Sequence, residues 1–224
     1  ARTGDIALSG FPIFLSQRAM IRAHVLAAMK QDSAAYLAAA QTYLEPVSPM
    51  VVAIGGLQGT GKSTLARALA AGLGRAPGAL IVRSDEIRKR LHGAEPEARL
   101  SPDAYTDAAN AATNAAVIEQ ARLAATAGHA VIVDATFLDT TMRHDLAAAV
   151  EVPFLGIWLT APLPVLESRI ASRSDDASDA TVAVLHRSVQ SDPGAGDWLA
   201  VDASDGAQVL AVVREAIGLN PRGL

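Results

Sequence analysis

The residues whose types and spacing most clearly predict chemistry lie in one glycine-rich stretch. Residues 56–63 read Gly-Leu-Gln-Gly-Thr-Gly-Lys-Ser and satisfy the pattern G-x-x-x-x-G-K-[ST] of a phosphate-binding loop. Glycines let consecutive backbone N–H groups converge on an anion, and the helix that follows directs its positive dipole end there. We expect Lys62 to reach the β- and γ-phosphates of a nucleotide and the Ser63 hydroxyl to bind Mg²⁺. The predicted nucleotide-binding residues of this loop are Gly56, Leu57, Gln58, Gly59, Thr60, Gly61, Lys62, Ser63 and Thr64.

An acidic and a basic residue follow the second apolar run that reads as a strand. The sequence Ser-Asp-Glu-Ile-Arg over residues 84–88 puts Asp85 just after that run and Arg88 one helical turn later. Ligands of parallel sheets bind at the carboxyl ends of the strands, so Asp85 should face the phosphate loop. It would accept the proton of a hydroxyl that attacks the γ-phosphate, and Arg88 would hold the acceptor or a phosphoryl oxygen. The alternative interpretation is a helix cap followed by an exposed arginine.

A third carboxylate ends the next apolar run. Asp134 follows Ile132-Val133, as an acidic residue does at the end of a Walker B strand. It would hold Mg²⁺ through water or orient Arg88 by a charge-assisted hydrogen bond. Thr136, two residues later, is a weaker candidate for contact with substrate or water.

Two arginines lie four residues apart on a predicted helix near residue 170. A polar loop follows Arg169 and Arg173, which predicts a lid that closes over the triphosphate and supplies guanidinium groups to the transition state. Arg173 ranks ahead of Arg169, and Arg187, on a later helix, is third. The alternative is a solvated basic end of a helix, which complements the helix dipole.

The elements that must position these residues alternate between strand and helix. Apolar runs predict strands at 50–54, 79–83, 130–133, 154–159 and 198–201. Between and after them, helices are expected at 62–73, 85–91, 101–126, 139–150, 162–172, 180–190 and 204–217. This order predicts the α/β class and a P-loop NTPase fold, with a five-stranded parallel sheet sandwiched by helices. In front of it, residues 15–30 and 34–44 predict a helical hairpin. We therefore expect an N-terminal helical segment at 1–48 and a P-loop domain at 49–224.

Composition limits the partners. The chain has 224 residues, half of them hydrophobic, which suffices for the core of one α/β domain. A formal net charge of −4 argues against nucleic acid or an anionic membrane as partner. No apolar run approaches the roughly 20 residues that span a bilayer. The absence of cysteine excludes disulfides and thiol chemistry and suits a cytoplasmic protein.

Taken together, the motifs resemble a known superfamily. They are Gly-Gly-Leu-x-Gly-x-Gly-Lys-Ser-Thr (55–64), Arg-Ser-Asp-x-Ile-Arg-Lys-Arg-Leu (83–91), Gly-His-x-Val-Ile-Val-Asp-Ala (128–135), Asp-Ala-Ser-Asp-Ala (176–180), Asp-Pro-Gly (192–194) and Val-Asp-Ala-Ser (201–204). The stretch 51–204 resembles the P-loop kinases that include phage polynucleotide 5′-kinase, zeta toxins, gluconate kinase and chloramphenicol phosphotransferase. It looks most like the ATP-binding half of bacterial two-domain proteins whose other half is similar to aminoglycoside phosphotransferases.

Residues 14–23 also resemble the last helices of that phosphotransferase-like half. The resemblance implies that the chain is the C-terminal piece of a larger protein. The catalytic elements of the upstream half are not in this sequence, so no aminoglycoside activity is carried over.

The resemblance to polynucleotide kinase implies Asp85 as base, Arg88 on the acceptor phosphate, Asp134 orienting Arg88 and a lid arginine on the donor. Our leading hypothesis is an ATP- and Mg²⁺-dependent kinase that phosphorylates a hydroxyl of a small molecule, with Lys62, Asp85, Arg88 and Arg173 catalytic. The expected partners are a nucleoside triphosphate, that acceptor and an upstream phosphotransferase-like domain. Two alternatives are a polynucleotide 5′-hydroxyl kinase and a regulatory module that hydrolyses ATP slowly.

Overall fold

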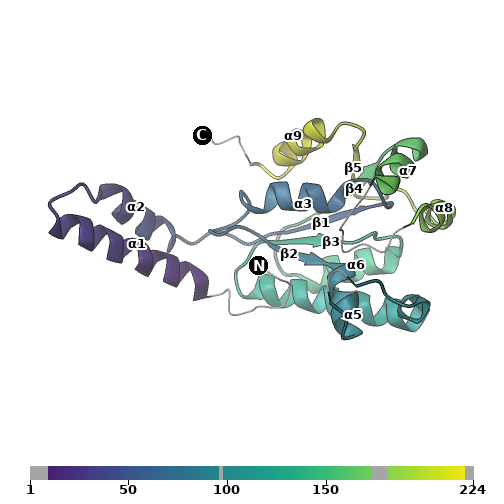
Figure 1. Ribbon diagram of the computed structural model, residues 1–224, viewed down its shortest axis with the longest axis horizontal. Helices are drawn as coiled ribbons and strands as arrows, with labels where there is room; N and C mark the ends of the chain where they lie inside the picture. Colours follow the sequence, from purple (N-terminus) through teal and green to yellow (C-terminus); the bar gives the residue numbers. More distant parts are fainter. Residues whose placement is uncertain (1–9, 96–97, 173–180, 220–224) are drawn as a thin grey trace.

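Five parallel strands form the centre of the protein. The computed structural model describes residues 10–95, 98–172 and 181–219. In it the strands lie in the order β2-β3-β1-β4-β5, and all neighbours run parallel (Figure 1). Their bounds are β1 Val51–Gly56, β2 Leu80–Arg83, β3 Val131–Asp134, β4 Phe154–Thr160 and β5 Leu199–Asp202. The predicted fold class and all five predicted strands are confirmed.

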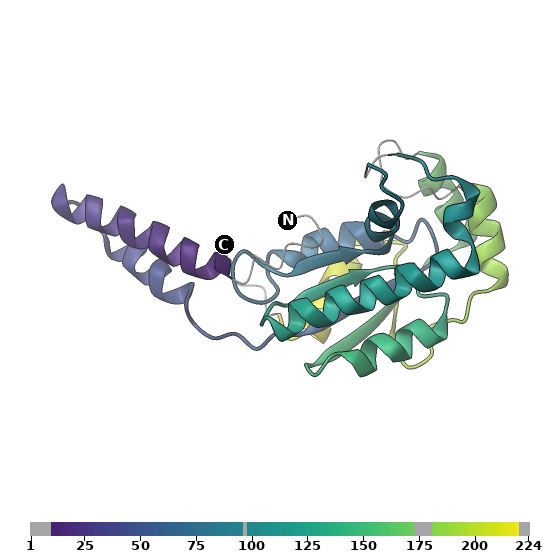
Figure 2. The same ribbon diagram turned by 90° about the horizontal axis from the view of Figure 1, so that it is seen from below.

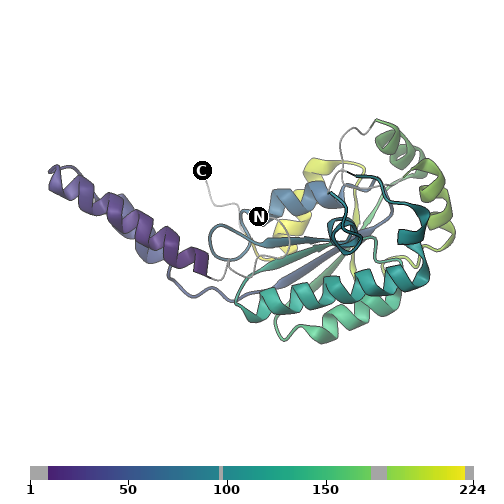
Figure 3. The ribbon, with the colours of Figure 1, turned by 60° about the horizontal axis from the view of Figure 1, so that its bottom comes forward.

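Helices cover both faces of the sheet, which is why the strands are continuous apolar runs. All six residues of β1 are buried, as expected for a parallel strand with a core on each side. Side chains alternate, so that Val51 and Ala53 belong to one core, and Val52 and Ile54 to the other. The first core is closed by α5 Asp107–Thr126 and α6 Thr140–Ala149, and the second by α3 Lys62–Ala70 and α9 Gly206–Ala216 (Figure 3).

Three further helices lie toward the carboxyl ends of the strands. They are α4 Ser84–Leu91, α7 Leu163–Ala171 and α8 Val182–Gln190. α7 and α8 pack together around Leu166, Ile170 and Leu185, apart from the two main cores. Residues of this small third cluster are therefore placed beside the phosphate loop rather than beneath it.

The helix predicted over residues 101–126 is wrong in one respect, because it is two elements. A 3-10 turn, η2 Pro102–Tyr105, precedes α5, and Thr106 between them is extended, with φ −64° and ψ 160°. The Thr106 hydroxyl accepts a hydrogen bond from Ala109 N at 3.3 Å, which makes Thr106 the N-cap of α5. The break turns the segment that precedes α5 toward the strand ends.

Two helices have their N-cap next to a serine that is also an acceptable cap residue. Ser84 is the first residue of α4 rather than its cap, and the N-cap is Arg83. α9 is capped by Asp205, whose carboxylate accepts from Ala207 N at 2.9 Å, and not by Ser204. A carboxylate is as good a cap as a hydroxyl, so spacing alone does not separate adjacent candidates.

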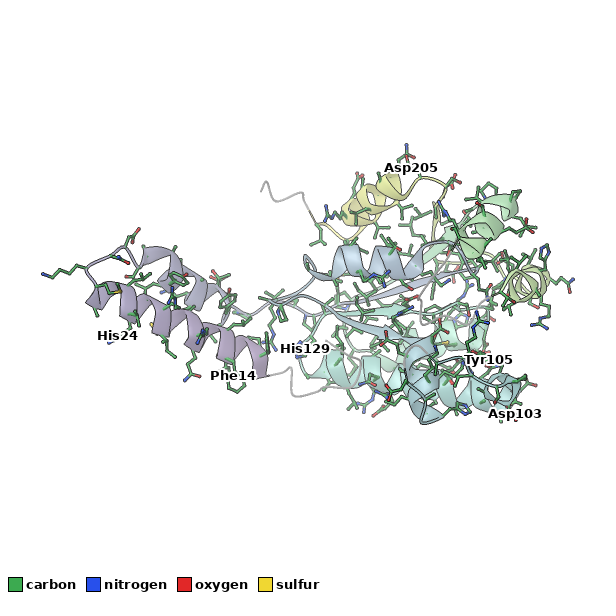
Figure 4. All side chains as sticks on the ribbon, in the orientation of Figure 1. Phe14, His24, Asp103, Tyr105, His129 and Asp205 are labelled. Carbon is green, nitrogen blue, oxygen red and sulfur yellow. The ribbon has the colours of Figure 1, made fainter. Side chains whose placement is uncertain are left out.

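The predicted N-terminal hairpin is confirmed. α1 Phe11–Ala28 and α2 Ala34–Thr42 pack against each other and extend away from the sheet (Figure 1, Figure 2). Small residues form their contact, and Ser16 Oγ donates to Ala40 O at 2.8 Å. Larger apolar side chains face outward, including Ile13 at 63% and Phe14 at 64% exposure (Figure 4). Within the described ranges, no helix has both the length and the apolar character needed to cross a membrane.

One arginine is enclosed by the only two tryptophans of the chain. The guanidinium of Arg143, which is 6% exposed, lies 4.2 Å from the ring centre of Trp158 and 4.9 Å from that of Trp198. Arg143 Nε donates to Phe137 O at 2.9 Å, and Nη1 donates to Gly194 O at 2.9 Å. The contact holds the loop after β3, in which Phe137 has the unusual φ of +51°.

The close packing of Trp198 against Gly156 leads to a prediction about the free energy of unfolding. A methyl group on Gly156 of β4 would collide with the indole of Trp198, which Phe137 and Phe154 also contact edge-on. We expect Gly156→Ala to lower the free energy of unfolding by about 1–3 kcal/mol, measured by urea denaturation. The matched control is Gly206→Ala, where an added methyl group meets nothing within 4 Å. Equal stability of Gly156→Ala and the wild type would contradict this packing.

Candidate phosphoryl-transfer site

A cavity of about 1020 Å³ lies at the carboxyl ends of the strands. The phosphate loop, the segments that follow β2 and β3, and helices α5 and α8 all contribute to its wall. It is therefore built where parallel sheets bind their ligands. The predicted residues Lys62, Ser63, Asp85, Arg88 and Asp134 all line it.

The phosphate loop has the backbone that the glycine pattern predicts. Gly56 has φ +134°, and a Cβ atom there would lie 2.5 Å from Leu159 O of the neighbouring strand. Thr60 Oγ1 donates to Leu57 O at 2.8 Å and closes the turn, and Gly61 precedes the first residue of α3. The loop thus leads directly into a helix N-terminus, the arrangement that binds phosphate through backbone N–H groups.

Lys62 lies across the mouth of this loop. Its Nζ donates to Gly56 O at 2.9 Å and to Leu57 O at 2.8 Å. The ammonium is a flexible point charge, so it can exchange these carbonyl oxygens for phosphate oxygens with rotation about its own stem.

The two residues predicted to bind Mg²⁺ contact each other. Ser63 Oγ donates to Asp134 Oδ2 at 2.6 Å. A hydroxyl and a carboxylate are hard oxygen ligands of the kind that Mg²⁺ takes, with water and phosphate oxygens completing its shell. Within the described residues, no group of three or more His, Asp or Glu side chains could hold a metal alone. The Ser63 and Asp134 oxygens therefore fit Mg²⁺ as two of its ligands.

Sequence reasoning missed the cation that holds this pair. Arg83 Nε donates to Asp134 Oδ2 at 3.2 Å, and its Nη2 donates to Ser63 Oγ at 3.2 Å. Arg83 ends β2, and Asp134 is its register partner on β3. In the described part of the chain the arginine that Asp134 contacts is thus Arg83, and not Arg88 as one interpretation had it. The sequence does show that both apolar runs end in a charged residue. Pairing Arg83 with Asp134, however, requires knowing that β2 and β3 are neighbours in the sheet.

Asp85 lines the cavity and lies among several charges. Burial raises the pKa of its carboxyl above the ordinary value, and the charge of Asp134 raises it further. Three cations lower the pKa of Asp85 without outweighing burial: Arg83, Lys62 and Arg88. A carboxylate whose affinity for a proton is increased, at the edge of a phosphate loop, is suited to act as a general base.

Arg88 is committed to the segment before α5. Its Nη1 donates to Ala104 O at 2.6 Å, and its guanidinium lies 4.9 Å from the centre of the Tyr105 ring. Arg88 thereby holds η2 over the cavity, and Tyr105 forms part of the cavity wall.

The predictions for the three candidate lid arginines differ in how they compare with the structure. Arg173 lies outside the described residues. Arg169 donates to Ala203 O at 2.9 Å and Ser204 O at 3.0 Å, so it ties α7 to the loop after β5. Only Arg187, which the sequence ranked third, lines the cavity among the described lid candidates.

The position of Arg187 depends on a contact between α8 and the phosphate loop. Gln58 Nε2 donates to the hydroxyl of Ser188 at 3.0 Å, next to Arg187 in the chain. On the other side of α8, His186 Nε2 lies 2.6 Å from Glu167 Oε1 of α7. These contacts bring an arginine from far along the sequence to the phosphate loop.

A parallel sheet with a glycine-rich loop after its central strand, a helix N-terminus and a Ser–Asp pair defines the P-loop class. Residues 51–191 match the AAA_33 family, which is described as an AAA domain, and the chain belongs to this family.

Curated relatives are longer than this chain. Uncharacterized protein Rv2004c of Mycobacterium tuberculosis and Uncharacterized protein Mb2027c of Mycobacterium bovis are each 32% identical to it over 200 residues. The match takes in 82% of this chain and 39% of each relative. The chain therefore spans about two fifths of the length of the curated relatives that it matches.

Solved structures share the fold. A gluconokinase from Sinorhizobium meliloti has a TM-score of 0.53 at 23% identity, covering 77% of this chain and 96% of its own. A sugar kinase from Janibacter has a TM-score of 0.57 at 20% identity, with coverage of 78% and 97%. The tunicamycin resistance protein of Deinococcus radiodurans has a TM-score of 0.54 at 21% identity, covering 78% of this chain and 98% of its own.

The raised pKa of Asp85 predicts that the ionised carboxylate, which the proposed base needs, lowers the stability of the folded chain. Because the folded chain holds a proton on Asp85 more tightly than the unfolded chain, ionisation of Asp85 opposes folding. The penalty is present at neutral pH and is lost below the ordinary carboxyl pKa of about 4. We therefore expect Asp85→Asn to raise the midpoint of thermal unfolding at pH 7.5, and this gain to shrink at pH 4.

Asp103→Asn, at an exposed carboxylate of η2 outside the cavity, is the matched control. A lower unfolding midpoint of Asp85→Asn at pH 7.5 would contradict the electrostatic argument.

Proposed function

We propose that the protein is a kinase that transfers the γ-phosphoryl group of ATP to a hydroxyl of a small-molecule acceptor. One observation carries the proposal: Asp85, a carboxylate with a raised pKa, shares a cavity with the phosphate loop. A module that only hydrolyses a nucleotide does not need a base such as Asp85 to take a proton from an acceptor. The gluconokinase and sugar kinase that share the fold are consistent with this activity.

The proposed reaction is a single displacement. The acceptor oxygen forms a bond to the γ-phosphorus, the bond from this phosphorus to the β–γ bridging oxygen breaks, and ADP leaves. Asp85 takes the proton of the acceptor hydroxyl, while the phosphate loop and Lys62 hold the donor phosphates. Mg²⁺, held from the Ser63 and Asp134 side, would neutralise charge on the β- and γ-phosphate oxygens.

Cations around the γ-phosphate complete the proposed site. Arg88 lines the cavity beside Asp85 and can hold the acceptor, and Arg187 lines it beside the phosphate loop. We propose that Arg187 is available to stabilise transition-state charge together with Arg173, which the sequence assigns to that role. Arg169 would act indirectly, because its hydrogen bonds go to backbone carbonyls. We also propose a cytoplasmic location, where ATP and Mg²⁺ are supplied.

Substitution of Asp85 tests the proposal directly. We expect Asp85→Asn to reduce transfer of label from [γ-³²P]ATP to acceptors by about 10²–10⁴-fold, because the amide does not accept the hydroxyl proton. Binding of a non-hydrolysable ATP analogue, measured by calorimetry, should remain within about threefold of the wild type. Asp103→Asn, outside the cavity, should retain transfer.

Full turnover of Asp85→Asn would show that the base is assigned wrongly. ATP hydrolysis that no acceptor stimulates would favour the regulatory ATPase over the kinase.

The N-terminal hairpin supports a separate proposal on domain organisation. Neither of the two main cores, nor the cluster of α7 and α8, includes a residue of α1 or α2. We propose that residues 1–48 form a unit distinct from the P-loop domain at 49–224. Its exposed apolar side chains would pack on another part of a longer protein, such as an upstream phosphotransferase-like domain.

Deletion of residues 1–48 tests this boundary. We expect the shortened chain to unfold cooperatively and to bind the ATP analogue within about threefold of the full chain, since both cores remain complete. Loss of cooperative unfolding on deletion would mean that the hairpin belongs to the P-loop domain.

A further inference from the structure

The cavity continues beyond the phosphate loop along the first turns of α5. Asp107, Asn110 and Asn114 line it at a spacing of three and four residues, which places them on one face of the helix. Tyr105 precedes them at the end of η2 and also lines the cavity, while Asp103 of the same turn does not. Both side chains are labelled in Figure 4. We call this part of the cavity, from Tyr105 to Asn114, the acceptor wall.

Carboxylates outnumber cations around the acceptor wall. Asp107 lies on this wall, and Asp85 and Asp139 also line the described cavity, whose one basic residue outside the phosphate-loop side is Arg88. Arg88 already donates to Ala104 O and contacts the Tyr105 ring. The other basic residues of the described cavity wall, Lys62 and Arg187, belong to the phosphate-loop side.

Neutral polar groups that line the same cavity have unused hydrogen-bonding capacity. Within the described chain, the Asn114 amide and the Ser84 and Thr136 hydroxyls line the cavity without a side-chain hydrogen bond. Asn110 uses its Nδ2 to donate to Tyr105 O at 3.2 Å, which leaves its carbonyl oxygen able to accept. Amides and hydroxyls both donate and accept, so they match the hydroxyl groups of a polyol in either direction.

From these groups we infer the class of acceptor: a polyhydroxylated molecule without anionic groups, on which an amino group is favoured. This inference rests on the proposed function for its assignment of Asp85 as base. A carboxylate or phosphate on the acceptor would lie among three carboxylates, of which Asp107 and Asp139 are exposed, and one arginine that is already engaged. Its charge would be opposed rather than paired, whereas an ammonium group would be attracted.

Three ligands with one carbon skeleton test the inference. D-glucose is neutral, D-glucosamine is cationic and D-gluconate is anionic. We expect calorimetry with the full chain and a saturating non-hydrolysable ATP analogue to give at least about tenfold tighter binding for glucosamine than for gluconate, with glucose between them. Gluconate binding as tightly as glucosamine, or no binding of either glucose or glucosamine, overturns the inference.

Charge-neutral variants separate this electrostatic selection from simple fit. Asp107→Asn combined with Asp139→Asn should weaken glucosamine binding about tenfold and strengthen gluconate binding, and should change glucose binding less than threefold. Asn can replace Asp139 as the N-cap of α6, where a side-chain oxygen accepts from Thr141 N. Asp103→Asn, with the same charge change outside the cavity, should alter none of the three. An unchanged glucosamine-to-gluconate ratio in the double variant overturns the inference.

The two proposals fail differently. If the charge order holds in binding but no ligand stimulates formation of ADP, the charge selectivity of the cavity stands, and the kinase assignment fails. If gluconate alone is phosphorylated and Asp85→Asn abolishes this transfer, the kinase assignment stands and the acceptor class fails.

Discussion

The hydrogen bond from Ser63 Oγ to Asp134 Oδ2 depends on β1 and β3 being neighbours, and the rest of the site depends on it in turn. It joins the end of the phosphate loop to the carboxyl end of the adjacent strand. Arg83, from the next strand of the sheet, donates to both partners. Two neighbouring strands, β3 and β2, and helix α3 after β1 thus contribute one side chain each to a network only a few ångströms across, and Asp85 lies two residues after Arg83.

Segments that are distant in sequence are fixed around this network by contacts to the backbone. Arg88 holds η2 through Ala104 O, Arg169 holds the loop after β5, and Arg143 holds the loop after β3. In each case the guanidinium donates hydrogen bonds to backbone carbonyl oxygens. These carbonyl groups lie in irregular segments and have no partner in a helix or sheet. The cavity wall is therefore shaped by arginines that do not all face into it.

Sequence reasoning identified the sheet and most of the cavity residues, because both follow from local rules. Continuous apolar runs indicate buried parallel strands, and residues just after such runs gather at one edge, which is how Asp85 and Asp134 were found. Lys62 and Ser63 were found from the glycine-rich phosphate-loop pattern. Arg83 was missed because its role follows from the order of β2 and β3, which no local pattern encodes. The break at Thr106 was missed because Pro102 and Thr106 are both acceptable helix starts, and packing decides between them. Arg187 could be listed from spacing, but its entry into the cavity depends on the contact from Gln58 to Ser188.

The enclosure of Arg143 has an optical consequence. Both indoles of the chain, Trp158 and Trp198, contact the same guanidinium, which also binds the carbonyl of Phe137 in the loop that forms part of the cavity wall. Their emission depends on how this charge is placed over their rings. Intrinsic fluorescence at 295 nm excitation, without any attached dye, therefore reports on the loop after β3 whenever a ligand displaces it.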